Sequence, residues 1–462
     1  MIVSPNFWDN LAGAARRLAL GALLAAGLAS ASMAQQPPLE GPVAGQLVSP
    51  PDAITIDGWL LYPTLRFSSQ YSNNLFQSPT NPLHAGSLGL SPALTAEWTD
   101  GIHRTSVYGN ANGAYYPGHT ELDTSDGQAG LIHSYAPLDD LIFRVQGDFT
   151  HQTFSNPLNS GIPGAITTPS STLLPNGNTL LPNGSIISPT GQFVGQGIPN
   201  LSAGTATNVV NPLNQFTATA GVDKTFNRGE LSFTTSISHS EYENHQFTPD
   251  FTSGTFSGHG AIWLHPLFYV YSDGTTSNRS DSSAYRALAG IGIGRPLEMF
   301  HGVIYYGHQG SEQDNAGSAG GDLFGASLLY DPLENWSVKA AFDETINEST
   351  QTGVSTIALS LPIPAPELIA QNVGTRIAAS TLQSTYRFSP LWAVSGRFSY
   401  THIDYFDSTR VDNAWLADAY VSYEMWRNMT LTCEYQYSSV TSNAPLISAY
   451  RHLVSMSAMY KF

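Results

Sequence analysis

Residues 450–462 alternate between two kinds of side chain with a period of two. One parity is mostly apolar, with Tyr450 at its start and Tyr460 and Phe462 at its end, whereas the other parity is mixed to polar. Successive side chains of a β-strand point to opposite faces. The pattern therefore predicts a strand with one face in lipid and the other in water.

The same alternation recurs along the chain from Gly58 onwards, in segments of about ten residues. Short turns rich in Pro, Gly, Asn and Asp separate many of these segments, and these residue types favour the backbone dihedrals of tight turns. Seven such turns begin at Thr99, Ala136, Asn227, Arg295, Asp331, Ser389 and Arg427.

If both ends of this region lie on one side of the membrane, the seven turns and eight longer connections predict about 16 strands. We expect strands to start near residues 58, 87, 103, 125, 140, 213, 230, 282, 299, 320, 336, 373, 391, 413, 429 and 447. The predicted fold is all-β: a transmembrane antiparallel β-barrel with short periplasmic turns, long extracellular loops and tryptophans near the strand ends. Its last hairpin should close against residues 59–67.

Two connections are longer than the rest. Residues 156–212 contain a repeated Thr-Leu-Leu-Pro-Asn-Gly sequence and form the third predicted outer loop, the position of the constriction loop in general porins. The loop either folds into the lumen or remains at the surface. Residues 244–281 include an apolar run, 261–271, which we expect either to extend a strand or to cap the mouth of the barrel.

The N-terminal residues have the organisation of a secretory signal. Arg16 and Arg17 precede an apolar run of about 14 residues, too short to span a bilayer, and Ala34 ends a small-x-small cleavage site. We therefore predict a signal peptide at 1–34, a Pro-rich periplasmic lead-in at 35–57 and the barrel at 58–462, placed in the bacterial outer membrane.

Composition and charge agree with this assignment. Charged residues make up 11% of the chain, against about 25% in soluble domains. The net charge of −17 argues against a nucleic-acid partner. The single cysteine, Cys433, excludes an internal disulfide, and it falls on the predicted lipid-facing parity.

The inward parity of the predicted strands collects the charged side chains. A charge facing lipid at mid-membrane costs about 2–4 kcal/mol for Arg or Lys, so this segregation supports the assignment of faces. The charges would either tune solute passage or pair across neighbouring strands. The predicted lumen-lining residues are Arg66, Arg104, Arg144, Asp148, Lys339, Asp343, Arg397, Asp418, Glu434 and Arg451.

The sequence contains few residues in patterns typical of enzyme active sites. No nucleophile elbow, zinc-protease motif or phosphate-binding glycine loop is present in the sequence. Rim hydrolases of the outer membrane suggest two weak candidates, His239-Ser240-Glu241 and the pair His402 and Asp404. We expect no enzyme activity, no metal site and no cofactor.

The segment 58–76, with its Pro63 and Tyr71-Ser-Asn-Asn motif, and the following Ser91-Pro-Ala-Leu94 resemble the opening of the putative type-2 β-barrel porin family. Asn73 stands where that family more often has an acid. The C-terminal Tyr460 and Phe462 resemble the barrel-assembly signal of outer-membrane proteins. Relatives associated with exopolysaccharide production imply a role in polymer passage or envelope assembly.

Two functions follow from this reading. The first is a channel for passive passage of small solutes or a secreted saccharide. The second is a non-conducting structural or assembly barrel whose lumen is occluded by residues 156–212. The expected partners are outer-membrane lipid, lipopolysaccharide and the barrel assembly machinery. The sequence leaves the oligomeric state open.

Overall fold

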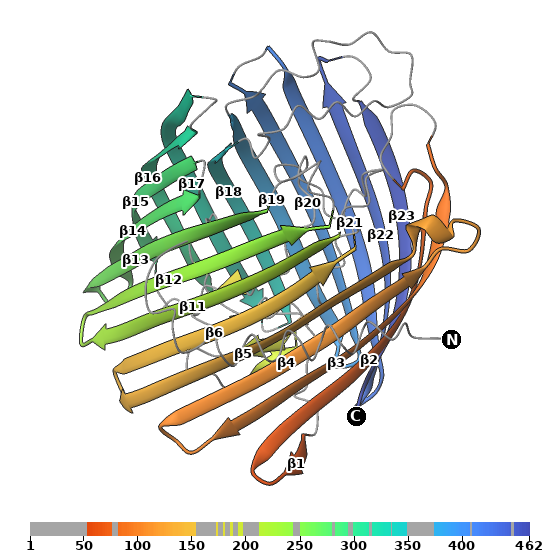
Figure 1. The fold of residues 1–462 in the computed structure, drawn as a ribbon, viewed down its shortest axis with the longest axis horizontal. Helices are drawn as coiled ribbons and strands as arrows, with labels where there is room; N and C mark the ends of the chain where they lie inside the picture. The colour runs from red at the N-terminus through yellow and green to blue at the C-terminus, as the bar shows by residue number, and fades with distance from the viewer. Residues whose placement is uncertain are drawn as a thin grey trace.

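The fold is a single closed wall of antiparallel strands (Figure 1). It is taken from a computed structural model. That structure describes residues 53–75, 82–153, 172–173, 179–180, 185–187, 193–196, 212–243, 250–279, 282–293, 299–313, 317–333, 335–348, 374–406, 409–444 and 448–462.

Eighteen strands form the barrel, and one short strand, β1 (Ile54–Ile56), is added to them. The barrel strands are β2 (Trp59–Ser72), β3 (Ala85–Thr99), β4 (His103–Tyr115), β5 (Thr124–Leu138), β6 (Leu141–Gln152), β11 (Leu213–Phe226), β12 (Gly229–Tyr242), β13 (Phe251–His265), β14 (Phe268–Arg279), β15 (Ser282–Ile293), β16 (Phe300–Gln313), β17 (Gly317–Leu333), β18 (Trp336–Glu348), β19 (Gly374–Ser389), β20 (Trp392–Tyr405), β21 (Val411–Trp426), β22 (Met429–Ser442) and β23 (Ala449–Lys461).

Each strand pairs with its sequence neighbours, and β23 closes the barrel against β2. The closing register runs from Thr64 opposite Lys461 to Ser72 opposite Leu453. The predicted closing segment, 59–67, therefore overlaps the observed one only in part, because β2 begins by pairing with β1 and β3 alone. β1 also lies within the predicted lead-in, where it forms a hairpin with β2.

The all-β barrel prediction is confirmed, and the count of about 16 strands is two too low. The missing pair is β13 and β14, which occupy most of the predicted loop 244–281 and turn at Pro266 and Leu267. Apolar and polar side chains alternate only weakly along β13 and β14, because Trp263, Tyr269 and Tyr271 are apolar and face inward.

Four very short strands form a second sheet within the connection from β6 to β11. They are β7 (Thr172–Leu173), β8 (Thr179–Leu180), β9 (Ser185–Ile187) and β10 (Phe193–Gln196). The rest of the predicted loop 156–212 lies outside the described residues, as do the predicted signal peptide 1–34 and most of the lead-in.

The outward face is apolar, as a lipid-facing surface requires. On β23, the outward side chains of Tyr450, Val454, Met456 and Tyr460 are 36–60% exposed, while the intervening Arg451 and Leu453 are each 2% exposed. The alternation predicted from the sequence is therefore the alternation between the two faces of the wall.

Aromatic residues on the outward face cluster beside the short turns. Trp392 stacks on Tyr423 with ring centroids 4.4 Å apart, and Phe300 stacks on Tyr330 at 4.5 Å. Rings with an apolar body and a polar edge favour the interface between hydrocarbon and headgroups. These clusters place the short turns at one membrane surface and the longer connections at the other.

The turn between β3 and β4 shows how local chemistry ends a strand. The Asp100 carboxylate accepts hydrogen bonds from the backbone N–H groups of His103 and Ile102, at 2.7 and 3.0 Å. These bonds, that from His103 first, lower the pKa of Asp100. Among the described residues, no helix is long and apolar enough to span a membrane.

Candidate functional site

The inward face of the barrel carries the candidate site. Every predicted lumen-lining residue lies on the inward parity of its strand. Arg66 is on β2, Arg104 on β4, Arg144 and Asp148 on β6, and Lys339 and Asp343 on β18. Arg397 is on β20, Asp418 on β21, Glu434 on β22 and Arg451 on β23.

Several inward charges are paired across adjacent strands. Arg397 and Asp418 lie directly opposite each other, with Nη2 2.5 Å from Oδ2. Arg144 pairs with Asp223 of β11 at 2.6 Å. Pairing of this kind cancels the field of each charge, so these pairs do not form a ring of one sign that would select ions strongly.

A further pair spans more than one strand. Arg286 of β15 lies 3.5 Å from Asp343 of β18, and its Nη2 also donates to the Tyr305 hydroxyl of β16 at 3.3 Å. The contact crosses the inner faces of β16 and β17. Sequence parity identified Asp343 but gave no reason to connect it to Arg286, because the two strands are not neighbours.

A polar cluster on β12, β13 and β14 could not be recognised from the sequence pattern. His259 Nδ1 lies 2.5 Å from Asp273 Oδ1, and its Nε2 lies 3.4 Å from Glu230 Oε1. His259 and Asp273 fall in the segment predicted to be a loop, so their inward parity was hidden. Groups of three or more His, Cys, Asp or Glu arranged for a metal are absent from the described residues.

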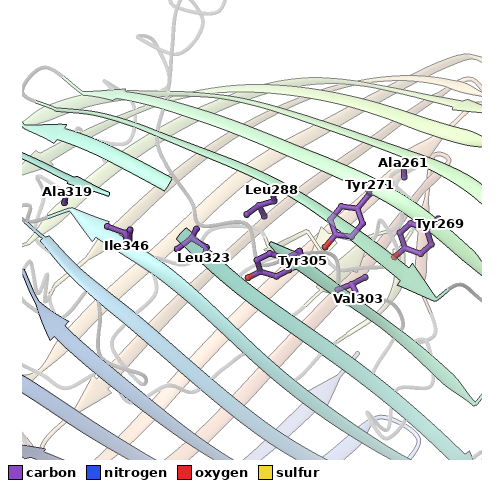
Figure 2. Close-up of a cluster of buried hydrophobic side chains, with 9 residues drawn as sticks. All are labelled: Ala261, Tyr269, Tyr271, Leu288, Val303, Tyr305, Ala319, Leu323 and Ile346. Carbon is purple, nitrogen blue, oxygen red and sulfur yellow. The ribbon is translucent and has the colours of Figure 1, made fainter. Parts of the chain in front are cut away.

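Next to these polar residues, the inward face has an apolar stripe (Figure 2). It consists of the buried side chains of Ala261, Tyr269, Tyr271, Leu288, Val303, Tyr305, Ala319, Leu323 and Ile346. Tyr305 is 1% exposed and Leu323 is fully buried. The stripe crosses six strands, from β13 to β18.

Tyrosines of the stripe lie over glycines on neighbouring strands. A Cβ built on Gly325 of β17 would sit 2.1 Å from the Tyr305 ring, and one on Gly292 of β15 would sit 2.0 Å from the Tyr269 ring. No side chain larger than hydrogen fits at these two positions while the rings stay in place. Glycine here lets an aromatic side chain lie flat along the wall.

Gly325→Ala is therefore expected to destabilise the barrel by about 1–3 kcal/mol through overpacking. Tyr305 cannot move away without losing its contact with Arg286. Urea unfolding of the detergent-folded protein measures the change. Gly147→Ala is the matched control, since a Cβ at Gly147 of β6 meets nothing within 4 Å. Equal unfolding midpoints for the two variants would contradict the close packing.

The two rim candidates for hydrolase chemistry face away from the lumen. His402 Nε2 lies 3.2 Å from Asp404 and its Nδ1 lies 2.8 Å from Asn413, all on the outward parity of β20 and β21. His239 is likewise outward, 3.4 Å from Glu241, while Ser240 between them points inward and is 2% exposed. The structure does not bring Ser240 and His239 together.

A closed antiparallel barrel with an apolar outer face and a polar inner face has the architecture of a transmembrane β-barrel. Residues 367–462 match the family described as "Putative beta-barrel porin 2". This is the family that residues 58–76 and 91–94 resemble, and the match lies in the C-terminal part of the chain, outside those residues. No curated protein matches the sequence.

Several solved structures are similar to this one at low identity. OccAB3 of Acinetobacter baumannii is 11% identical with a TM-score of 0.47, covering 87% of this chain and 99% of that chain. OccK3 (OpdO) of Pseudomonas aeruginosa is 12% identical with a TM-score of 0.45, covering 87% and 95%. The FrpB iron transporter of Neisseria meningitidis is 8% identical with a TM-score of 0.40, covering 87% and 81%.

Proposed function

We propose that this protein is an outer-membrane channel for the passive passage of small neutral solutes, including saccharides. The observation that carries the proposal is the hydroxyl-rich inward face of β12 and β13. The inward residues that remain partly exposed there are Ser232, Thr234 and Ser236 of β12 and Ser257 of β13.

Hydroxyl groups both donate and accept hydrogen bonds, and so do the hydroxyls of a sugar. A wall of serine and threonine can therefore exchange bonds with a passing saccharide at little cost in desolvation. The ion pairs Arg397–Asp418 and Arg144–Asp223 contribute no net charge. Both features favour a neutral polar solute over an ion.

The strand number also supports passage. Small eight-stranded barrels are filled by their own side chains or hold one small ligand, while barrels of 16–18 strands leave an aqueous channel. This barrel has 18 strands. Its circumference is large enough for a water-filled lumen.

Conductance in planar bilayers and swelling of liposomes test the proposal together. We expect the folded protein to conduct with a cation-to-anion permeability ratio close to one, and to admit neutral disaccharides faster than charged sugars of equal size. A folded protein that neither conducts nor causes swelling would contradict it. Strong selectivity for one sign of ion would contradict the role given to the paired charges.

A second candidate function is a non-conducting structural or assembly barrel associated with exopolysaccharide production. The specific observation in its favour is the burial of inward charged side chains: Arg451 and Lys461 are each 2% exposed. An open lumen would leave such side chains more accessible to water. In this case the intact protein would be silent in bilayers, and deleting residues 156–212 would make it conduct.

A further inference from the structure

The barrel wall is interrupted between β17 and β18 in its outer half. The two strands pair from Leu333 opposite Trp336 to Gly325 opposite Asp343, and their ladder stops there. β17 continues to Gly317 paired with β16, and β18 continues to Glu348 paired with β19. Residues 317–324 of β17 therefore have a ladder partner on one side only.

Beyond the interruption, the end of β18 overlaps β17 face to face instead of pairing with its edge. Ile346 shares the parity of the outward Glu344, yet it is 2% exposed and packs in the apolar stripe with the inward residues Leu323 and Ala319 of β17 (Figure 2). The side-chain amide of Gln309, inward on β16, donates to the Ile346 carbonyl at 2.5 Å and accepts from its N–H at 3.3 Å. The outer end of β18 therefore lies inside β17.

Two side chains replace part of the missing ladder. Glu344 Oε2 accepts a hydrogen bond from the Phe324 N–H at 3.2 Å, and Arg376 of β19 donates to the Asp322 carbonyl at 3.4 Å. Arg376 and Glu344 also pair with each other at 3.1 Å. The Arg376 side chain remains 43% exposed on the outward face.

In the described part of the barrel, this seam has the shortest backbone ladder between neighbouring strands. Parting any fully paired seam breaks a row of backbone hydrogen bonds, which lipid cannot replace. Among the described residues, parting the outer half of the β17–β18 seam breaks the contacts of Glu344, Arg376 and Gln309, the packing of Leu323 with Ile346 and the contact between the Phe324 and Phe342 rings, but few backbone ladder bonds. An apolar chain inserted there would replace that packing with its own.

The chemistry of the seam matches a single apolar chain with an anionic end. Between the sheets lie Leu323, Ala319 and Ile346, and at the outward edge stands the Arg376 guanidinium, which binds carboxylates well. The overlap is one strand wide, which suits one chain better than two. The apolar stripe continues from this point along the inner wall towards Tyr305 and Val303.

We propose that the overlap of β17 and β18 is a binding site for a long-chain fatty acid that enters laterally from the outer leaflet. The chain lies between Leu323 and Ile346, and its carboxylate takes the place of Glu344 beside Arg376. This ligand class differs from the polar solutes of the proposed channel, and its binding is independent of conductance.

Photolabelling with a diazirine analogue of palmitate tests the site on the full-length protein carrying Cys433→Ala. Phe324→Cys and Phe342→Cys, whose native rings lie 6.0 Å apart across the seam, are joined by a short bifunctional thiol reagent. The matched control joins Phe398→Cys and Trp415→Cys, whose native rings are 5.4 Å apart across the intact β20–β21 ladder. Label on Leu323 and Ile346 should be lost on crosslinking the seam and kept on crosslinking the control.

Arg376→Gln tests the carboxylate contact. Palmitate should bind about tenfold more weakly to this variant, whereas hexadecanol, which has the same chain and no charge, should bind as before. Label confined to outward-facing residues, or label that persists when the seam is crosslinked, would overturn the proposal. Labelling of the seam by a photoreactive phospholipid and not by the fatty acid would overturn the assignment of the ligand.

Discussion

Met456→Arg is expected to destabilise the barrel by about 2–4 kcal/mol, the cost of a cation facing lipid at mid-membrane. Met456 lies near the middle of β23, points outward and is 60% exposed. Urea unfolding in lipid vesicles measures the loss, and a heat-modifiability gel reports whether the barrel still closes.

Ser457→Arg is the control for that substitution. Ser457 is the next residue on the same strand, points inward and is only partly buried. A guanidinium there faces the polar interior, so the variant should unfold close to the wild-type midpoint. Similar losses for both variants would mean that β23 does not separate lipid from lumen in the way described.

Arg397→Ala is expected to cost about 3 kcal/mol, because it leaves the Asp418 carboxylate without its partner. The Asp418 side chain is 3% exposed, whereas that of Arg397 is 33% exposed. Most of the loss in stability therefore comes from the buried Asp418 carboxylate that is left without its partner. Urea unfolding above pH 7, where a carboxylate is ordinarily ionised, measures the cost.

The double variant Arg397→Ala with Asp418→Asn separates loss of the pair from loss of packing. Because it removes the buried charge as well, it should recover most of the stability that the single variant loses. A double variant no more stable than Arg397→Ala would show that the guanidinium contributes through packing and not through charge.

Much of the site could be predicted because a strand has only two faces. Arg397, Asp418 and Arg451 were assigned inward from parity alone, and the structure places them there. Whether they influence passage is a separate question that parity does not address. Pairing between adjacent strands also follows from parity, since the register of a short turn puts particular residues opposite each other.

The period-two pattern did not predict strands where apolar residues face inward as well as outward. Tyr269 and Tyr271 make both faces of β14 apolar near the turn, so the period-two pattern disappears and two strands were read as a loop. The cause is tertiary: these rings are buried against Leu288 and Val303 on strands further along the chain. His259 and Asp273 were lost from the candidate site for the same reason.

The sequence by itself determined that this chain forms a lipid-exposed β-barrel, because a two-residue period and tight-turn chemistry act over a few neighbouring residues. Only the tertiary structure decided the contact from Arg286 to Asp343, the tyrosines lying over glycines, and the overlap of β17 and β18. The first of these features joins strands that are not neighbours, and the other two depend on how neighbouring strands pair and pack. Side-chain parity carries no information about either.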